Sequence, residues 1–268
     1  MADSNLRNLS QEPQELALSG HMTAEQIEIR ECTRLEEMAE CVRLQRAVFA
    51  LPETELSPVR HFVVTKNAGG FTLGAFLNER LIAFVLSVPA FLRGDKAFYS
   101  HMTAVDPEYQ GTGIGARIKW AQRKRSLELG VRSIKWTFEP VKARNAYFNL
   151  EKLGAVVREY EPNFYGTDYT SGDEKIGLAS DRLFAEWELE SEKVTELATG
   201  NEYIEHARIA REISIPADWP GLVRSDARAA VAEQVRIKYE FEAAFADGLI
   251  CRGFQRDAEM PKYLLFEE

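Results

Sequence analysis

Three glycines stand at alternate positions, Gly111, Gly113 and Gly115, directly before a segment with helical periodicity. A glycine-rich turn at the start of a helix presents several backbone N–H groups, and the helix dipole adds partial positive charge there. Such a turn can bind phosphate, because glycines adopt positive φ and let the anion approach the backbone closely. The spacing therefore predicts a phosphate site at residues 110–116.

Two common phosphate motifs fit this turn poorly. A P-loop requires Lys followed by Ser or Thr after its last glycine, and no such pair follows here. The dinucleotide motif G-x-G-x-x-G would place its third glycine, or an alanine, at Ala116. That motif normally follows its strand directly, whereas residues 106–109 intervene here. Nucleotide binding by this turn stays an alternative.

Composition limits the classes of partner. The net charge of −9 argues against a general nucleic-acid binder, whose affinity comes from Lys and Arg. No run of about 18 apolar residues is present, so we expect no membrane partner. Cys32, Cys41 and Cys251 form neither a metal-binding spacing nor a disulfide framework. We therefore expect a cytoplasmic protein that binds no metal.

Hydrophobic periodicity predicts alternating strands and helices up to residue 190. The predicted strands are 26–31, 71–78, 80–92, 97–105, 133–139, 155–160 and 182–190, and the predicted helices are 34–49, 113–129 and 141–154. Strands 71–78 and 80–92 read as a hairpin that turns at Asn78 and Glu79. The segment 52–70 is predicted as a loop.

The signal changes after residue 190. A short helix, a strand near 203–213, a long helix at 225–247 and a closing strand-like segment, KYLLFEE, are expected there. We predict a tail at 1–24, a domain at 25–190 and a C-terminal extension at 191–268 that packs on it.

Two sequence blocks resemble one family. Gln110-x-x-Gly113-x-Gly115, preceded by Val105-Asp106-Pro107, resembles the coenzyme A pyrophosphate loop of the GNAT superfamily of acyl-CoA-dependent N-acyltransferases. The block NLEKLGA at 149–155 is similar to a helix end of the same family. The resemblance covers roughly residues 26–190, and the runs at 100–102, 136–140 and 144–149 resemble a less-characterised subgroup. It implies an α/β (α+β) fold with a mixed, mostly antiparallel sheet flanked by helices.

The resemblance also implies how coenzyme A (CoA) binds. Strands 97–105 and 133–139 should start paired and then separate, with the pantetheine arm in the gap. The residues implied for pantetheine are Thr103, Ala104 and Val105, and those for pyrophosphate are Gln110, Gly111, Thr112, Gly113, Ile114, Gly115 and Ala116. Arg117 and residues 119–125 could contact the adenosine phosphate, although 123–125 could equally be a solvated helix face. Asn145 and Asn149 could bind CoA or substrate amide groups; Asn145 could instead cap the helix locally.

Aminolysis of a thioester needs a neutral amine, so a base must take a proton from it. Glu139 ends the strand 133–139 on the face of Thr137 and could act as base or amine anchor, or could be a helix-entry charge. His101 could shuttle the proton or be a buried structural histidine. The family's thiol-protonating Tyr corresponds to Leu150, so Tyr147 or Tyr165 would have to replace it unless both only pack.

The sequence therefore predicts an N-acyltransferase that moves an acyl group from acetyl-CoA, or another acyl-CoA, to the amine of a small molecule such as an amino acid. A succinyl-CoA-dependent enzyme is one alternative, and a non-catalytic acyl-CoA-binding module is another. The loop 52–70 and the extension would wall the acceptor site. Exposed strand edges make a homodimer plausible.

Overall fold

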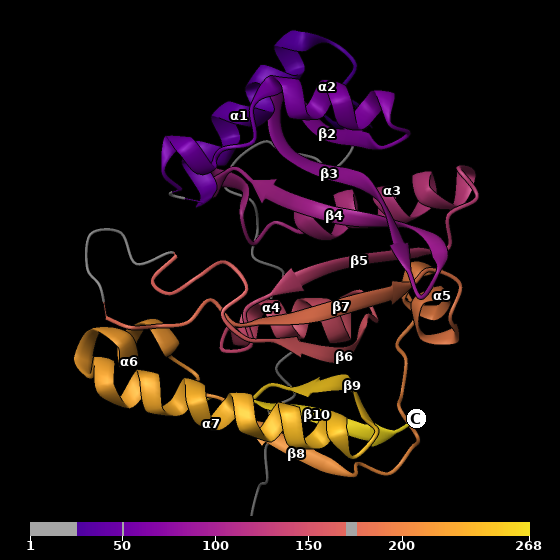
Figure 1. Ribbon diagram of the computed structural model, residues 1–268. Coiled ribbons are helices and arrows are strands. Elements are labelled where there is room, and N and C mark those ends of the chain that lie inside the picture. The colour runs from indigo at the N-terminus through magenta and orange to yellow at the C-terminus, as the bar shows by residue number, and fades with distance from the viewer. Residues whose placement is uncertain (1–25, 50, 170–175) are drawn as a thin grey trace, which may run out of the picture.

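The computed structural model describes residues 26–49, 51–169 and 176–268 (Figure 1). In this part of the chain ten strands form one sheet in the order β1-β2-β3-β4-β5-β7-β6-β9-β10-β8. The strands are β1 (Ile27–Glu31), β2 (Phe71–Leu77), β3 (Arg80–Leu92), β4 (Asp95–Val105), β5 (Ser133–Phe138), β6 (Val156–Glu161), β7 (Arg182–Glu188), β8 (Arg211–Ser214), β9 (Leu249–Gln255) and β10 (Lys262–Glu267). Every pairing except that of β4 with β5 is antiparallel, which confirms the predicted mixed sheet.

The helices lie between these strands and cover the sheet. They are α1 (Leu35–Phe49), α2 (Val59–Asn67), α3 (Ile114–Glu128), α4 (Ala143–Tyr147), α5 (Glu192–Ala198), α6 (Trp219–Ser225) and α7 (Ala227–Ala246). A π-helical turn, Phe148–Lys152, continues α4. The elements predicted before residue 190 are present, and Asn78 and Glu79 turn the β2–β3 hairpin with φ of 47° and 67°.

The predicted loop at 52–70 is wrong, because it contains a short 3-10 turn (Glu53–Glu55) and helix α2. Helix α2 has the sequence VRHFVVTKN, whose three valines have low helix propensity. Its stability comes from packing instead, since Phe62 and Thr65 are buried. After residue 190, α6 and β9 were also not predicted, and β8 is shorter than the strand expected at 203–213.

Two apolar clusters place helices on opposite faces of the N-terminal strands. Phe84 and Leu86 of β3 belong to a cluster with α1 and α2, whereas Ala83 and Val85 belong to a larger cluster that includes Ile114 of α3. Successive strand residues point to opposite faces, so one strand serves both clusters. Strand β4 therefore lies between α1 on one face, joined there by His61 of α2, and α3 on the other face.

The C-terminal segment continues the same sheet (Figure 1). Strand β9 pairs with β6 at Cys251 and Val157, and α7 packs against β6, β8 and β9. The division of the chain at residue 190 stays a prediction. None of the helices among the described residues is long and apolar enough to cross a membrane.

Candidate functional site

Strands β4 and β5 form a gap at the centre of the sheet. They pair in parallel only at Phe98 with Ile134 and Tyr99 with Lys135. Strand β4 then runs on to Val105 while staying paired with β3, and β5 runs on to Phe138 while staying paired with β7. The two strands thus start paired and then separate, as predicted. One edge of residues 103–105 faces this gap, where Ala104 is buried and its two neighbours are half-buried.

The glycine-rich turn lies at the end of β4. A 3-10 turn (Pro107–Tyr109) follows the strand, and Asp106 accepts a hydrogen bond from the N–H of Glu108. Gly111 and Gly113 have φ of 83° and 86°, a region that glycine adopts without strain. Within the part of the chain that the structure describes, the N–H groups of residues 111–115 donate no hydrogen bond. They gather at the N-terminal end of α3, where the helix dipole favours an anion.

Two side chains fix the shape of the turn. Gln110 donates from Nε2 to the carbonyl of Val105 at 3.1 Å, and Thr112 donates from Oγ1 to the carbonyl of Tyr109 at 2.6 Å. Gly115 differs from the other two glycines because its φ is not positive, and an added Cβ would meet only Val105 Cγ2 at 3.7 Å. Packing inside the protein therefore does not require glycine at position 115, which fits a ligand that approaches the backbone there.

The cations of α3 are only partly available to a phosphate. Arg117 donates to the carbonyl of Ile27 at 3.3 Å, Arg123 donates to that of Leu189 at 2.7 Å, and Arg125 forms an ion pair with Glu31. Lys124 is exposed. The suggestion that Lys119 contacts the adenosine phosphate is wrong, because this side chain is buried under the sheet.

Lys119 instead lies at the vertex of the gap, the point where β4 and β5 stop pairing. Its Nζ lies 2.7 Å from Gln122 Oε1, 3.1 Å from Ser100 Oγ and 3.9 Å from the ring centroid of Trp136. Ser100 and Trp136 come directly after the last paired residues of β4 and β5. Desolvation lowers the pKa of Lys119 to about 7, so both the charged and the neutral form of this side chain are populated near neutral pH.

The opposite face of the same strands is polar, and we call Tyr99, His101, Thr137, Glu139 and Arg182 the polar face. Thr137 lies opposite Phe184 of β7, and Phe138 lies opposite Leu183. Continued by one residue, this register places Glu139 beside Arg182, on the same face of the sheet as Thr137. The pKa of Tyr99 is raised to about 12, mainly by burial, with Thr137 and Tyr165 as its polar neighbours. Its phenol therefore keeps its proton at neutral pH.

His101 is the extra residue of a β-bulge. Ser100 pairs with Ser87 and Met102 pairs with Leu86, which leaves His101 between them without a partner on β3. Its Nε2 lies 3.2 Å from Ser57 Oγ, and its ring stacks on His61 of α2 with centroids 5.2 Å apart. The pKa of His101 is lowered to about 4, first by desolvation and then by His61. The ring keeps exposed surface, so a bound molecule can reach it.

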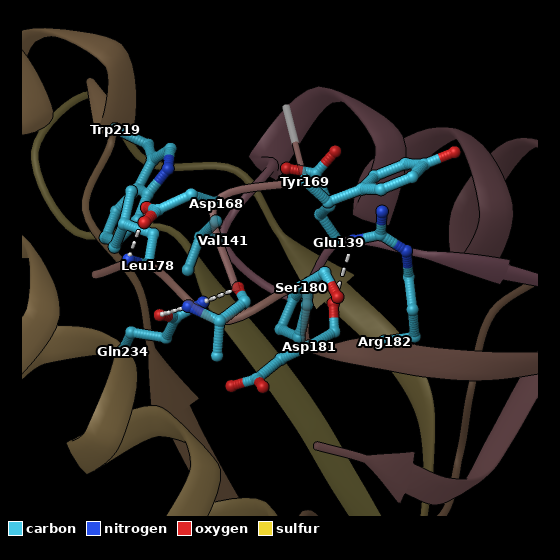
Figure 2. A pocket seen from close by; sticks show the side chains of 12 residues that line it. Glu139, Val141, Asp168, Tyr169, Leu178, Ser180, Asp181, Arg182, Trp219 and Gln234 are labelled. Atoms are coloured by element: carbon cyan, nitrogen blue, oxygen red, sulfur yellow. Dashed lines mark hydrogen bonds between the residues drawn. The ribbon is translucent and has the colours of Figure 1, made fainter. Parts of the chain in front are cut away.

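Glu139 lines a small pocket of about 50 Å³ beside the end of β5 (Figure 2). Its carboxylate lies 2.6 Å from Lys142 Nζ. Figure 2 shows Asp168, Tyr169 and Arg182 around the same pocket. The C-terminal segment adds further walls: Trp219 lines the pocket, and Gln234 bonds both the N–H and the carbonyl of Ala179.

The tyrosine candidates have packed rings. Arg256 of the C-terminal segment lies over the ring of Tyr147 at 3.7 Å, which places that ring against the extension. Tyr165 stacks on Tyr169 with centroids 4.8 Å apart and lies under Arg182. Leu150 is fully buried in the core.

The two asparagines do not share one environment. Asn145 of α4 is exposed, whereas Asn149 is buried. The π-helical turn separates them, since the N–H of Leu153 bonds the carbonyl of Phe148 five residues earlier. Such turns occur frequently at functional sites, and Asn149 lies in this one.

Four residues in or beside the polar face were not predicted from the sequence: Tyr99 and Arg182, which belong to it, and Ser57 and His61, which contact His101. Tyr99 stands two residues before His101 in a recognised strand, so alternation could have indicated it. The others come from segments far away in the chain, and only the tertiary structure brings them together. Among the described residues, no group of three or more His, Cys, Asp or Glu side chains could hold a metal ion.

Comparisons with known proteins agree with this geometry. Residues 34–155 match the model of the acetyltransferase (GNAT) family. The fold is similar to that of a GNAT-family protein from Desulfovibrio desulfuricans, with 14% identity, a TM-score of 0.51 and coverage of 61% of this chain and 99% of that one. It is also similar to a protein described as an acetyltransferase from Acinetobacter baylyi, with 16% identity, a TM-score of 0.50 and coverage of 62% and 94%.

No curated protein matches the chain in sequence. The matched segment runs from α1 to the residue before β6 and contains the gap, the glycine-rich turn and helix α3. The family match and the fold therefore coincide on these elements, and residues 34–155 are similar to an acetyltransferase (GNAT) domain.

Proposed function

We propose that this protein transfers an acyl group from acyl-CoA to the amine of a small molecule. The observation that carries the proposal is the divergence of β4 from β5 immediately beside a turn with unbonded N–H groups. This combination suits acyl-CoA, a thioester with an extended pantetheine arm and a pyrophosphate. The unpaired strand edge can hydrogen-bond the amide groups of the arm, while the turn binds the charged pyrophosphate.

The binding residues proposed for CoA follow from this arrangement. Thr103, Ala104 and Val105 offer the strand edge for pantetheine. The turn from Gln110 to Ala116 is proposed for the pyrophosphate, with the N–H groups of residues 111–115 as donors, because those of Gln110 and Ala116 already bond the carbonyls of Pro107 and Gly113. Asn149, buried on the π-helical turn, is the better placed of the two asparagines to contact the arm, and exposed Asn145 would contact only its outer end.

The polar face supplies groups for direct attack of the amine on the thioester. His101 is neutral at pH 7, because its pKa lies near 4, so it can accept a hydrogen bond or proton from the amine. Glu139 would anchor or deprotonate the amine at the end of β5. Tyr99 keeps its proton and can donate to the departing thiolate. Backbone N–H groups beside the β-bulge would stabilise the oxyanion.

Acetyl is the default acyl group, and succinyl is the alternative. The acceptor is proposed to be a small molecule such as an amino acid. A cytoplasmic location and a homodimer remain predictions.

One observation favours a second candidate, a module that binds acyl-CoA without turnover. The position of the family's thiol-protonating Tyr is held by Leu150, which is fully buried. Tyr147, the nearest replacement on that helix, packs against Arg256. If neither Tyr99 nor Tyr165 protonates the thiolate, acyl-CoA would bind and remain intact.

Thermal melting with acetyl-CoA, succinyl-CoA, free CoA or ATP tests the binding step. A ligand that binds only the native state stabilises it by about 2.7 kcal/mol at 100 times Kd. We expect a rise in Tm with the CoA compounds and none with ATP. CoA release in the presence of a panel of amines then separates the enzyme from the binding module. Absence of a shift with every CoA compound would overturn both.

A further inference from the structure

Arg182 is a buried cation that forms no ion pair with any described residue. The residue is 8% exposed, and among the described residues its one hydrogen bond runs from Nη1 to the carbonyl of Asp181 at 3.0 Å. Across residues 26–49, 51–169 and 176–268, no carboxylate lies within 4.0 Å of the guanidinium. By contrast, Arg30 and Arg158 pair with Glu37 and Glu186 at 2.6 and 2.8 Å. A guanidinium carries five N–H donors, so most of those of Arg182 remain available.

The carboxylates around the pocket are already engaged. Asp168 accepts from the N–H groups of residues 176–178, and Asp181 accepts from Tyr160 Oη at 2.6 Å and from the N–H of Asn163 at 2.8 Å. Glu139 is paired with Lys142. Because these anions have other partners, the cation of Arg182 is the charged group without a partner among the described residues that line the pocket (Figure 2).

The position of Arg182 relates it to the reaction. Strand β7 lies next to β5, on the side away from the gap, and neighbouring strands are about 4.8 Å apart. Phe138 pairs with Leu183, so Glu139 and Arg182 are the next residues along the two strands, at the open end of the gap. A carboxylate held by Arg182 would therefore leave an amine one or two bonds away close to the gap. The pocket of about 50 Å³ has room for a group of that size.

We propose that Arg182 binds the carboxylate of the acceptor, so that the acceptors are amino acids or other small amines that carry a carboxylate near the amine. Guanidinium and carboxylate are geometrically matched for a two-pronged contact. The inference rests on the proposed function, because it names the substrate class of the same site. Tyr165, whose ring lies 5.0 Å from the Arg182 guanidinium, would help to hold that guanidinium in its orientation.

The experiment measures CoA release with each of the common amino acids and with its matched carboxamide as acceptors. We expect the intact chain to prefer one or more amino acids over their amides by at least ~10-fold in kcat/KM. Arg182→Gln should reduce this preference to within about 2-fold, and Arg182→Lys, which keeps the charge, should retain part of it. The amine basicity of acid and amide differs, but this difference cancels when the ratio is compared between variants.

Arg132→Gln is the control, since Arg132 is 79% exposed and pairs with Glu190 outside the pocket, and it should leave the preference unchanged. A melting shift with acetyl-CoA shows that each variant is folded. If Arg182→Gln does not fold, two other measurements replace it. One is the acid-over-amide preference of Arg182→Lys, and the other is whether the acid raises the Tm of the intact chain with CoA more than the amide does.

Equal use of acids and amides by the intact chain would overturn the inference while leaving the proposed function standing. A preference that survives in Arg182→Gln would do the same. Failure of every amine to release CoA would overturn the proposed function, and the inference with it.

Discussion

The two sides of the β4–β5 gap are built in different ways. The glycine-rich turn presents backbone N–H groups from one stretch, residues 111–115, and its shape depends on two residues with positive φ. The polar face consists of side chains from β4, β5 and β7, completed by Ser57 and His61. A backbone site of this kind suits any molecule with the same phosphate, whereas a site made of side chains can be altered one residue at a time. Under the proposed function, the turn would bind the shared co-substrate and the polar face would select the acceptor.

The largest expected effect comes from placing a negative charge in the turn. Ala116 is the third residue of α3, two after Ile114. A carboxylate there interacts favourably with the helix dipole, by about 0.3–1 kcal/mol, in the free protein. The same carboxylate would repel a pyrophosphate. Ala116→Glu should thus keep or raise the Tm of the free protein and weaken CoA binding by more than ~100-fold, a change that the CoA-dependent melting shift reports.

Ala116→Gln is the matched control for that experiment, because it has the same length and no charge. It should weaken CoA binding by less than ~10-fold, which is the cost of bulk alone. A full CoA shift in Ala116→Glu would contradict the assignment of the turn to the pyrophosphate.

A smaller effect is expected on the polar face, where His101→Gln removes the ring but keeps a hydrogen-bonding side chain. The acyl-transfer rate should fall by about 10²-fold, the lower end for loss of an acid–base group, while the CoA melting shift stays intact. Because the pKa of His101 is near 4, its protonation should not reduce kcat/KM between pH 8 and pH 6. In that range the rate should follow the ionisation of the acceptor amine instead. His206→Gln, an exposed histidine, serves as the control.

An unchanged rate in His101→Gln would remove this histidine from the reaction. A loss of the CoA shift in the same variant would instead indicate that the bulge in β4 shapes the gap. Measuring both quantities in one variant therefore tells whether the two sides of the gap act separately.

The contrast between the two sides also explains how much of the site could be predicted. Spacing alone indicated the turn, because Gly111 and Gly113 mark the positive φ values that a nest of N–H groups requires. Alternation of apolar and polar residues predicted the two strands of the gap, and helical periodicity predicted the helix that follows the turn. Helix α2 was not predicted, because its three valines have low helix propensity. His61, which stacks on His101, lies on this helix and was therefore not predicted either. Arg182 begins a strand that was predicted, yet nothing in the sequence shows that its charge is buried without a counter-ion among the described residues.

The pH dependence of folding stability tests the low pKa of Lys119, at the vertex of the gap. Lys119 has a pKa near 7 in the folded protein, against an ordinary value of 10.5, so the unfolded chain binds more protons between these pH values. Folding stability should therefore rise with pH, by about 1 kcal/mol from pH 7 to pH 8 on account of this group. Lys119→Met should lack that rise, as urea unfolding at the two pH values would measure. Lys124→Met, at an exposed position, should behave like the intact chain, and equal slopes in all three proteins would contradict the low pKa.

The smallest effect is expected outside both sides of the gap, at Tyr147. Arg256 lies over its ring at 3.7 Å, an interaction that depends on the aromatic face and not on the hydroxyl. We therefore propose that Tyr147 holds the C-terminal segment against α4, and Tyr147→Phe should change the acyl-transfer rate by less than about 2-fold. Tyr147→Leu should lower stability by about 0.5–1 kcal/mol because the cation–π contact is lost. Should Tyr147→Phe instead reduce the rate by about 10²-fold or more, its hydroxyl would be the acid that replaces the one absent at Leu150, and the protonating group would lie on α4 and not on the polar face.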